Sequence, residues 1–112
     1  MRLVDDDVVE LGNLGRQIAY SDRHVGRRKV DALCDRLSAI RGKVRIESCP
    51  MRLCSDNAEH LLMGTDFAVV AADEPMPEIM QWIDTTAYKL DLAYICASNN
   101  PPEIRLGPLF RP

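Results

Sequence analysis

The apolar run at residues 67–73, which reads FAVVAAD, constrains the fold of this chain more than any other feature. Its continuously apolar centre is typical of a strand that helices cover on both faces, as in a parallel sheet. The residues that follow, 78–90, have a helical pattern, with Ile79 and Ile83 among the apolar positions. We therefore expect an α/β protein in which residues 67–73 lie in the middle of the sheet.

Strand and helix patterns alternate in the first half of the chain as well. Leu3 and Val4 end a first strand, and residues 26–40 are predicted to form a helix that Gly42 ends. The apolar stripe of this helix repeats at spacings of three and four: Val30, Leu33, Cys34, Leu37 and Ile40. Residues 43–49 alternate as a strand does.

The second half continues the alternation. In this half, the segment around Leu61 and Leu62 suits a short helix and residues 92–96 suit a strand, while residues 13–20 in the first half suit a short helical turn. The sequence SNNPP at residues 98–102 predicts a loop, and an extended segment follows at residues 104–110. The whole order predicts a Rossmann-like, three-layer αβα fold with a mostly parallel sheet and right-handed crossovers.

Composition narrows the function classes. At 112 residues the chain is one domain at most, and its net charge of -3 offers no basic surface for nucleic acid. No apolar run approaches the roughly 20 residues that cross a bilayer, so no membrane partner is expected. Acidic residues begin at Asp5, which argues against a signal peptide and favours a cytoplasmic location.

Polar residues gather directly after the first strand. Asp5, Asp6 and Asp7 close it, and residues 13–17 suit a turn that enters a short helix. In an open α/β sheet, ligands bind at the carboxyl ends of the strands, where loops leave the sheet and helix N-termini present amide hydrogens. A nucleotide site at this edge is the natural hypothesis.

The same stretch resembles the ThiF/MoeB/HesA family of ubiquitin-activating-enzyme-like adenylyltransferases. The family pattern is Asp-x-Asp-Val, then Asn-Leu-x-Arg-Gln, then Val-Gly and a lysine about a dozen residues beyond the glutamine. The matching positions in this chain are Asp5, Asp7, Val8, Asn13, Leu14, Arg16, Gln17, Val25, Gly26 and Lys29. The spacing agrees throughout, which makes this a fairly specific signal.

The resemblance implies an enzyme that uses ATP and Mg²⁺ to activate the C-terminal carboxylate of a ubiquitin-like or sulfur-carrier protein, or of a peptide. It implies that Asp5 accepts hydrogen bonds from the ribose hydroxyls. Arg16 and Lys29 would hold the phosphates and serve catalysis, Arg16 as a planar fork and Lys29 as a compact charge. Asn13 and Gln17 would complete the nucleotide contacts.

The resemblance also places a Mg²⁺ ligand and catalytic residue at Asp73. Family members carry an Asp-x-x-Asp-Asn type of segment after the buried strand, and a carboxylate is the hard oxygen ligand that Mg²⁺ prefers. This chain reads AADEP at residues 71–75, so only one of those aspartates is present. A strand-ending acid that caps the next helix is the alternative role for Asp73.

Residues 1–112 match only the middle of a family domain and are interpreted as a partial ThiF-type nucleotide-binding domain, truncated at both ends. The sequence contains neither the glycine-rich phosphate loop expected ahead of Asp5 nor the cysteine region expected after the segment RLGPLFRP at residues 105–112. A strand edge left bare by the absent segment recruits partners, and family members are commonly homodimers, so we expect a homodimer.

Two alternative functions remain open. A relative without the phosphate loop could be a catalytically inactive binding or assembly module that keeps only the fold. A nicotinamide-dinucleotide domain would also use Asp5 on a ribose, but the sequence has no Gly-x-Gly-x-x-Gly motif.

Overall fold

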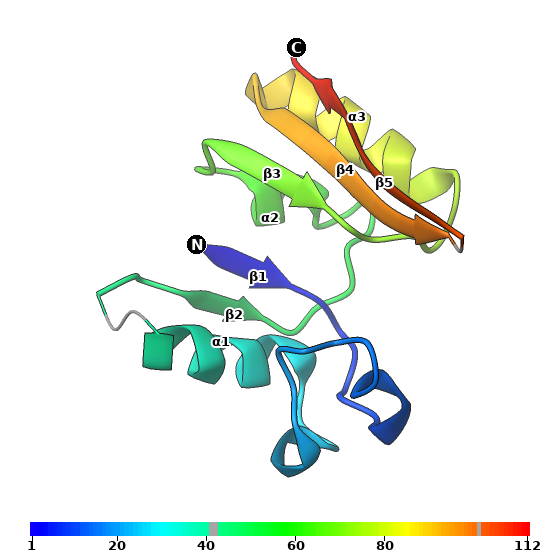
Figure 1. Ribbon diagram of the computed structural model, residues 1–112. Helices are drawn as coiled ribbons and strands as arrows, with labels where there is room; N and C mark the ends of the chain where they lie inside the picture. Colours follow the sequence, from blue (N-terminus) through cyan, green and yellow to red (C-terminus); the bar gives the residue numbers. More distant parts are fainter. Residues whose placement is uncertain (41–42, 101) are drawn as a thin grey trace. The chain divides into compact units, whose positions relative to one another are not determined.

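The computed structural model describes residues 1–40, 43–100 and 102–112 (Figure 1). These residues form two compact units, Met1–Arg52 and Leu53–Pro112. Both units combine helices with parallel strands, so the expected α/β class is confirmed. Among the described residues, no helix has the length and apolar character needed to cross a membrane.

Two short parallel strands and one helix organise the first unit. Strand β1 (Arg2–Val4) pairs with β2 (Glu47–Cys49) in parallel, with Leu3 opposite Ser48. Helix α1 (Lys29–Ile40) lies in the connection between the strands and contacts both of them. A parallel pair requires such a crossover, which the predicted strand–helix–strand order supplies.

Helix α1 begins three residues later than the predicted start at residue 26. Gly26 has a φ of +84°, in the left-handed region, which interrupts a right-handed helix. The backbone there pairs with an earlier loop instead: the Gly26 N–H donates to the Val9 carbonyl, and the Val9 N–H donates to the Arg27 carbonyl, both at 2.8 Å. The predicted helix end at Gly42 lies outside the described residues.

The remaining elements of the first unit are short. The strand predicted over residues 43–49 is β2, only three residues long, because its partner β1 offers only three residues to the ladder. The connection between β1 and α1 contains two single-turn 3₁₀ helices, η1 (Leu11–Asn13) and η2 (Asp22–His24). In place of the helical turn predicted over residues 13–20, the structure has η1, which begins two residues earlier.

The second unit is a three-stranded sheet with a helix on one face. Its elements in chain order are α2 (Ala58–Leu62), β3 (Phe67–Val70), α3 (Glu78–Leu90), β4 (Ala93–Asn100) and β5 (Glu103–Phe110). β4 lies in the middle, parallel to β3 and antiparallel to β5 (Figure 1). The core joins one sheet face to α3 through Val70, Ile79, Ile83, Ala87, Leu92 and Tyr94.

Two expectations for this unit are wrong. In its sheet, β3 lies at an edge rather than in the middle, and its Phe67 and Val69 side chains are 48% and 66% exposed. The expected loop at residues 98–102 is largely strand: β4 continues to Asn100, and Asn99 lies opposite Ile104 of β5. Cross-strand pairing here outweighs the turn preference of asparagine, and Pro101 lies outside the described residues.

Candidate functional site

Three aspartates follow the carboxyl end of β1, as the sequence predicts. The Asp5 N–H donates to the Cys49 carbonyl at 3.3 Å, which extends the pairing with β2 by one residue. The Asp5 carboxylate then accepts the Asp7 N–H at 2.8 Å. This turn fixes the Asp5 side chain at the strand end and leaves its second oxygen able to accept further hydrogen bonds.

Lys29, the first residue of α1, is joined to Asp7 by both backbone and side chain. The Lys29 N–H donates to the Asp7 carbonyl at 2.9 Å, and Lys29 Nζ donates to Asp7 Oδ2 at 2.6 Å. The Lys29 side chain is only 13% exposed, whereas that of Asp7 is 64% exposed. The fold thus holds an ammonium group at the edge where the sequence predicts phosphate contacts.

The electrostatics keep Lys29 charged. Burial lowers the pKa of Lys29, but the hydrogen bond to Asp7 and the charges of Asp7 and Asp5 outweigh it, so the pKa is raised. Tyr20 belongs to the same cluster, since its hydroxyl donates to the Lys29 carbonyl at 3.4 Å. Burial and the nearby Asp5 raise the pKa of Tyr20, which keeps the phenol neutral.

The residues of the Asn-Leu-x-Arg-Gln motif lie in and after η1. Asn13 is buried, and its side-chain oxygen accepts the Glu10 N–H at 3.0 Å, which holds the turn. Arg16 is exposed, and its side chain donates to the Gly12 carbonyl at 2.8 Å, so its other N–H donors are available to a ligand. Gln17 Oε1 is buried and accepts no hydrogen bond within the described part of the chain.

Asp73 lies in the second unit, three residues beyond β3, and it is exposed. Its assignment as a Mg²⁺ ligand stays a prediction. In the first unit, carboxylate oxygens of Asp5, Asp6 and Asp7 lie within 4.8 Å of one another. Oxygen donors of this kind suit Mg²⁺ chemically, although Lys29 already neutralises one of the carboxylates.

The sequence does not identify two members of this cluster as site residues. Asp7 matches the family motif, but its role as the ion-pair partner of Lys29 depends on a contact between residues 22 positions apart. Tyr20 carries no motif signal at all. Neither contact can be predicted from the sequence, because both form only when the chain folds back beside the end of β1 before α1 begins.

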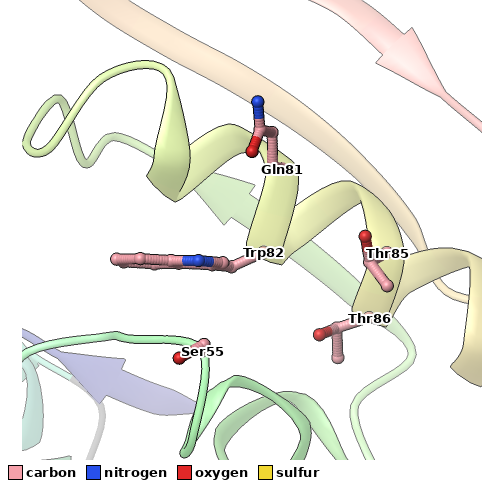
Figure 2. Close-up of a pocket in the computed structure, with 5 residues that line it drawn as sticks. All are labelled: Ser55, Gln81, Trp82, Thr85 and Thr86. Carbon is pink, nitrogen blue, oxygen red and sulfur yellow. The ribbon is translucent and has the colours of Figure 1, made fainter.

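A pocket of about 280 Å³ lies in the second unit, separate from the predicted site residues. Figure 2 shows Gln81, Trp82, Thr85 and Thr86 extending from α3, and Ser55 on the loop ahead of α2. Its lining is hydroxyl and amide groups beside one indole ring. None of the charged residues predicted to contact a nucleotide is among those that line it.

The fold and the strand-end cluster define a Rossmann-like α/β protein with acids and a cation at the carboxyl end of its first strand. Residues 1–100 match the ThiF family, and the chain belongs to that family. The predicted family and fold class are thereby confirmed.

Similarity to individual proteins supports this family assignment. A sulfur carrier protein adenylyltransferase of Thermus thermophilus is 41% identical over 71 residues, covering 63% of this chain and 26% of that protein. The adenylyltransferase and sulfurtransferase UBA4 of Meyerozyma guilliermondii is 34% identical over 116 residues, covering 97% and 27%. A crystal structure of E. coli MccB with ATP superposes with a TM-score of 0.91 at 25% identity, covering 99% of this chain and 33% of that one. The chain thus spans about a quarter to a third of these relatives.

Proposed function

We propose that this chain supplies the nucleotide-binding part of an ATP-dependent adenylyltransferase. Its substrate would be the C-terminal carboxylate of a ubiquitin-like or sulfur-carrier protein, or of a peptide. The observation that carries the proposal is the charged Lys29 ammonium held by Asp7 beside Asp5 at the carboxyl end of β1. Relatives described as adenylyltransferases support the same reaction class.

In this reaction, an oxygen of the acceptor carboxylate attacks the α-phosphorus of ATP. The bond from that phosphorus to the bridging oxygen breaks, and pyrophosphate leaves with the electron pair. Lys29 and Arg16 would offset the charge that develops on the phosphate oxygens. Lys29 has three N–H donors, so it can keep its bond to Asp7 while donating to a phosphate.

The other predicted residues would position the nucleotide. Asp5 would accept hydrogen bonds from the ribose hydroxyls through the oxygen that the Asp7 N–H leaves free. Gln17 and Asn13 would complete the nucleotide contacts. Asn13 would donate its side-chain amide hydrogens, because its side-chain oxygen already accepts the Glu10 N–H. Asp73 would hold Mg²⁺, which when bound neutralises phosphate charge.

The proposal includes a cytoplasmic homodimer. A dimer would cover the apolar side chains that β3 and β5 leave exposed, such as Val69 at 66% and Leu106 at 75%. The net charge of -3 offers no basic surface for nucleic acid, so the proposed partners are ATP and a protein or peptide.

Calorimetric titration of the chain with ATP, with and without Mg²⁺, tests the proposal. We expect binding that Mg²⁺ strengthens and that Lys29→Ala and Arg16→Ala each weaken by about tenfold or more, the usual cost of losing a hydrogen bond to a charged group. The matched control is Arg105→Ala, which removes an exposed cation from β5. Absence of ATP binding by a folded chain would favour the inactive binding or assembly module instead.

A further inference from the structure

A second pocket, of about 340 Å³, lies in the first unit away from the predicted nucleotide contacts. Residues of η2, of α1 and of the segment between them line it: Arg23, His24, Arg27, Asp35, Arg36 and Ala39. Its volume is within the roughly 300–1,000 Å³ of small-molecule sites. Neither Asp5 nor Lys29 is among the lining residues, so the family motif does not account for this pocket.

Positive charge is in excess around the pocket. Arg27 Nη2 donates to Asp35 Oδ2 at 2.6 Å, so the one carboxylate present is already paired. The side chains of Arg23 and Arg36 make no hydrogen bond or ion pair within the described part of the chain. Two guanidinium groups, each with five N–H donors, are therefore available to an anion.

His24 adds a third donor to the pocket. The residue is only 4% exposed, and its Nδ1 accepts the Ser21 N–H at 3.0 Å. Because Nδ1 accepts, the ring proton of neutral His24 is on Nε2. That N–H makes no hydrogen bond among the described residues and is not fully shielded from solvent, so it is available to an acceptor in the pocket that His24 lines.

We propose that this pocket binds a phosphate group, either as the free ion or as the phosphoryl group of a small molecule. The available groups are all donors: one imidazole N–H and two guanidinium groups, on η2 and α1. A phosphate has enough oxygens to accept from all three residues at once, whereas a single carboxylate has only two oxygens. The site is separate from the Asp5–Lys29 cluster and does not depend on the proposed function.

The test is a titration of the ¹⁵N-labelled chain with inorganic phosphate and, separately, with AMP, followed through the His24 Nε2 and arginine Nε resonances. We expect saturable shifts at His24 that Arg36→Gln and Arg23→Gln each weaken by about tenfold. Tighter binding of phosphate would identify the free ion as the ligand, and tighter binding of AMP a phosphoryl group.

Two variants isolate the pocket from other cations. Arg105→Gln and Lys89→Gln each remove an exposed cation of the second unit. Both should leave phosphate binding unchanged. The proposal is overturned if His24 shows no saturable shift, if Arg105→Gln or Lys89→Gln weakens binding as much as Arg36→Gln, or if an oligoglutamate peptide binds more tightly than either phosphate compound.

Discussion

Lys29 shows why a single residue of this chain has to be understood through its neighbours. A lone lysine at a helix start would be a solvated surface cation, but here 87% of the side chain is covered and the charge is balanced by Asp7. Removal of Asp7 would leave a buried ammonium group with one fewer anion, which is costlier than the loss of an exposed pair. The pair therefore links folding of the β1–α1 connection to the position of the residue that is proposed to contact phosphate.

The raised pKa of Lys29 predicts a loss of stability in alkali. A lysine whose pKa is higher in the folded state than its unfolded value of about 10.4 stabilises the fold fully below that pH. The contribution disappears as pH rises through the folded pKa, and Tyr20 acts in the same direction because its pKa is also raised. The urea midpoint of the chain should therefore fall steeply above about pH 10.

The variant Lys29→Met should have a shallower alkaline decline, because the titrating ammonium is gone. Lys89→Met is the matched control, since it removes a lysine whose pair with Glu59 is mostly exposed. Equal declines for Lys29→Met and the unsubstituted chain would show that Lys29 does not determine the alkaline limit.

At the scale of elements, prediction from the sequence succeeded where periodicity alone decides the structure. Helix α3 has the predicted bounds, 78–90, because its apolar stripe repeats over three turns and packs on the sheet. Prediction from the sequence failed where distant segments pair. The start of α1 depends on Gly26 and Arg27 pairing with Val9, and β4 continues through Asn99 because β5 returns beside it.

The candidate site shows the same contrast between features set by local sequence and features set by distant contacts. The position of Asp5 at a strand end was predictable from the motif, whereas the hydrogen bonds of Lys29 to Asp7 and of Tyr20 to Lys29 were not. The pocket lined by His24 and the arginines, for which we propose phosphate binding, had no sequence signal either. It depends on a 3₁₀ turn that buries His24 next to arginines of η2, of the segment before α1 and of α1 itself.

Gly26 is one of the positions where the backbone favours glycine. Its φ of +84° is costly for other residues, while a Cβ placed there would meet no atom within 4 Å. Gly26→Ala should therefore destabilise the fold by about 1–2 kcal/mol through backbone strain alone. Urea unfolding measures this directly, with Gly12→Ala as the control, because Gly12 has equally open surroundings and no positive φ. A destabilisation as large for Gly12→Ala would refute backbone strain as the cause.

For the molecule as a whole, the sheet of the second unit has one covered and one bare face. Paired residues share a face, so Val70 and Tyr94 turn toward α3 while Val69 and Ile95 turn away. A bulge sets two residues of β5, Gly107 and Pro108, against one of β4, Cys96, between the pairs Ile95–Leu109 and Ala97–Leu106. It therefore places the apolar side chains of β5 on the bare face: Ile104, Leu106 and Leu109.

This bare face predicts self-association of the chain. Ile104 and Leu106 are 84% and 75% exposed, and with Val69 they form an apolar surface of the kind that marks an interface. Leu106→Lys and Val69→Lys should each shift the chain toward monomer in sedimentation velocity, because burying a lysine in an apolar contact is unfavourable. Tyr88→Lys, at a 79% exposed position of α3, should leave association unchanged. A monomeric unsubstituted chain, or equal effects of all three substitutions, would show that this face does not mediate association.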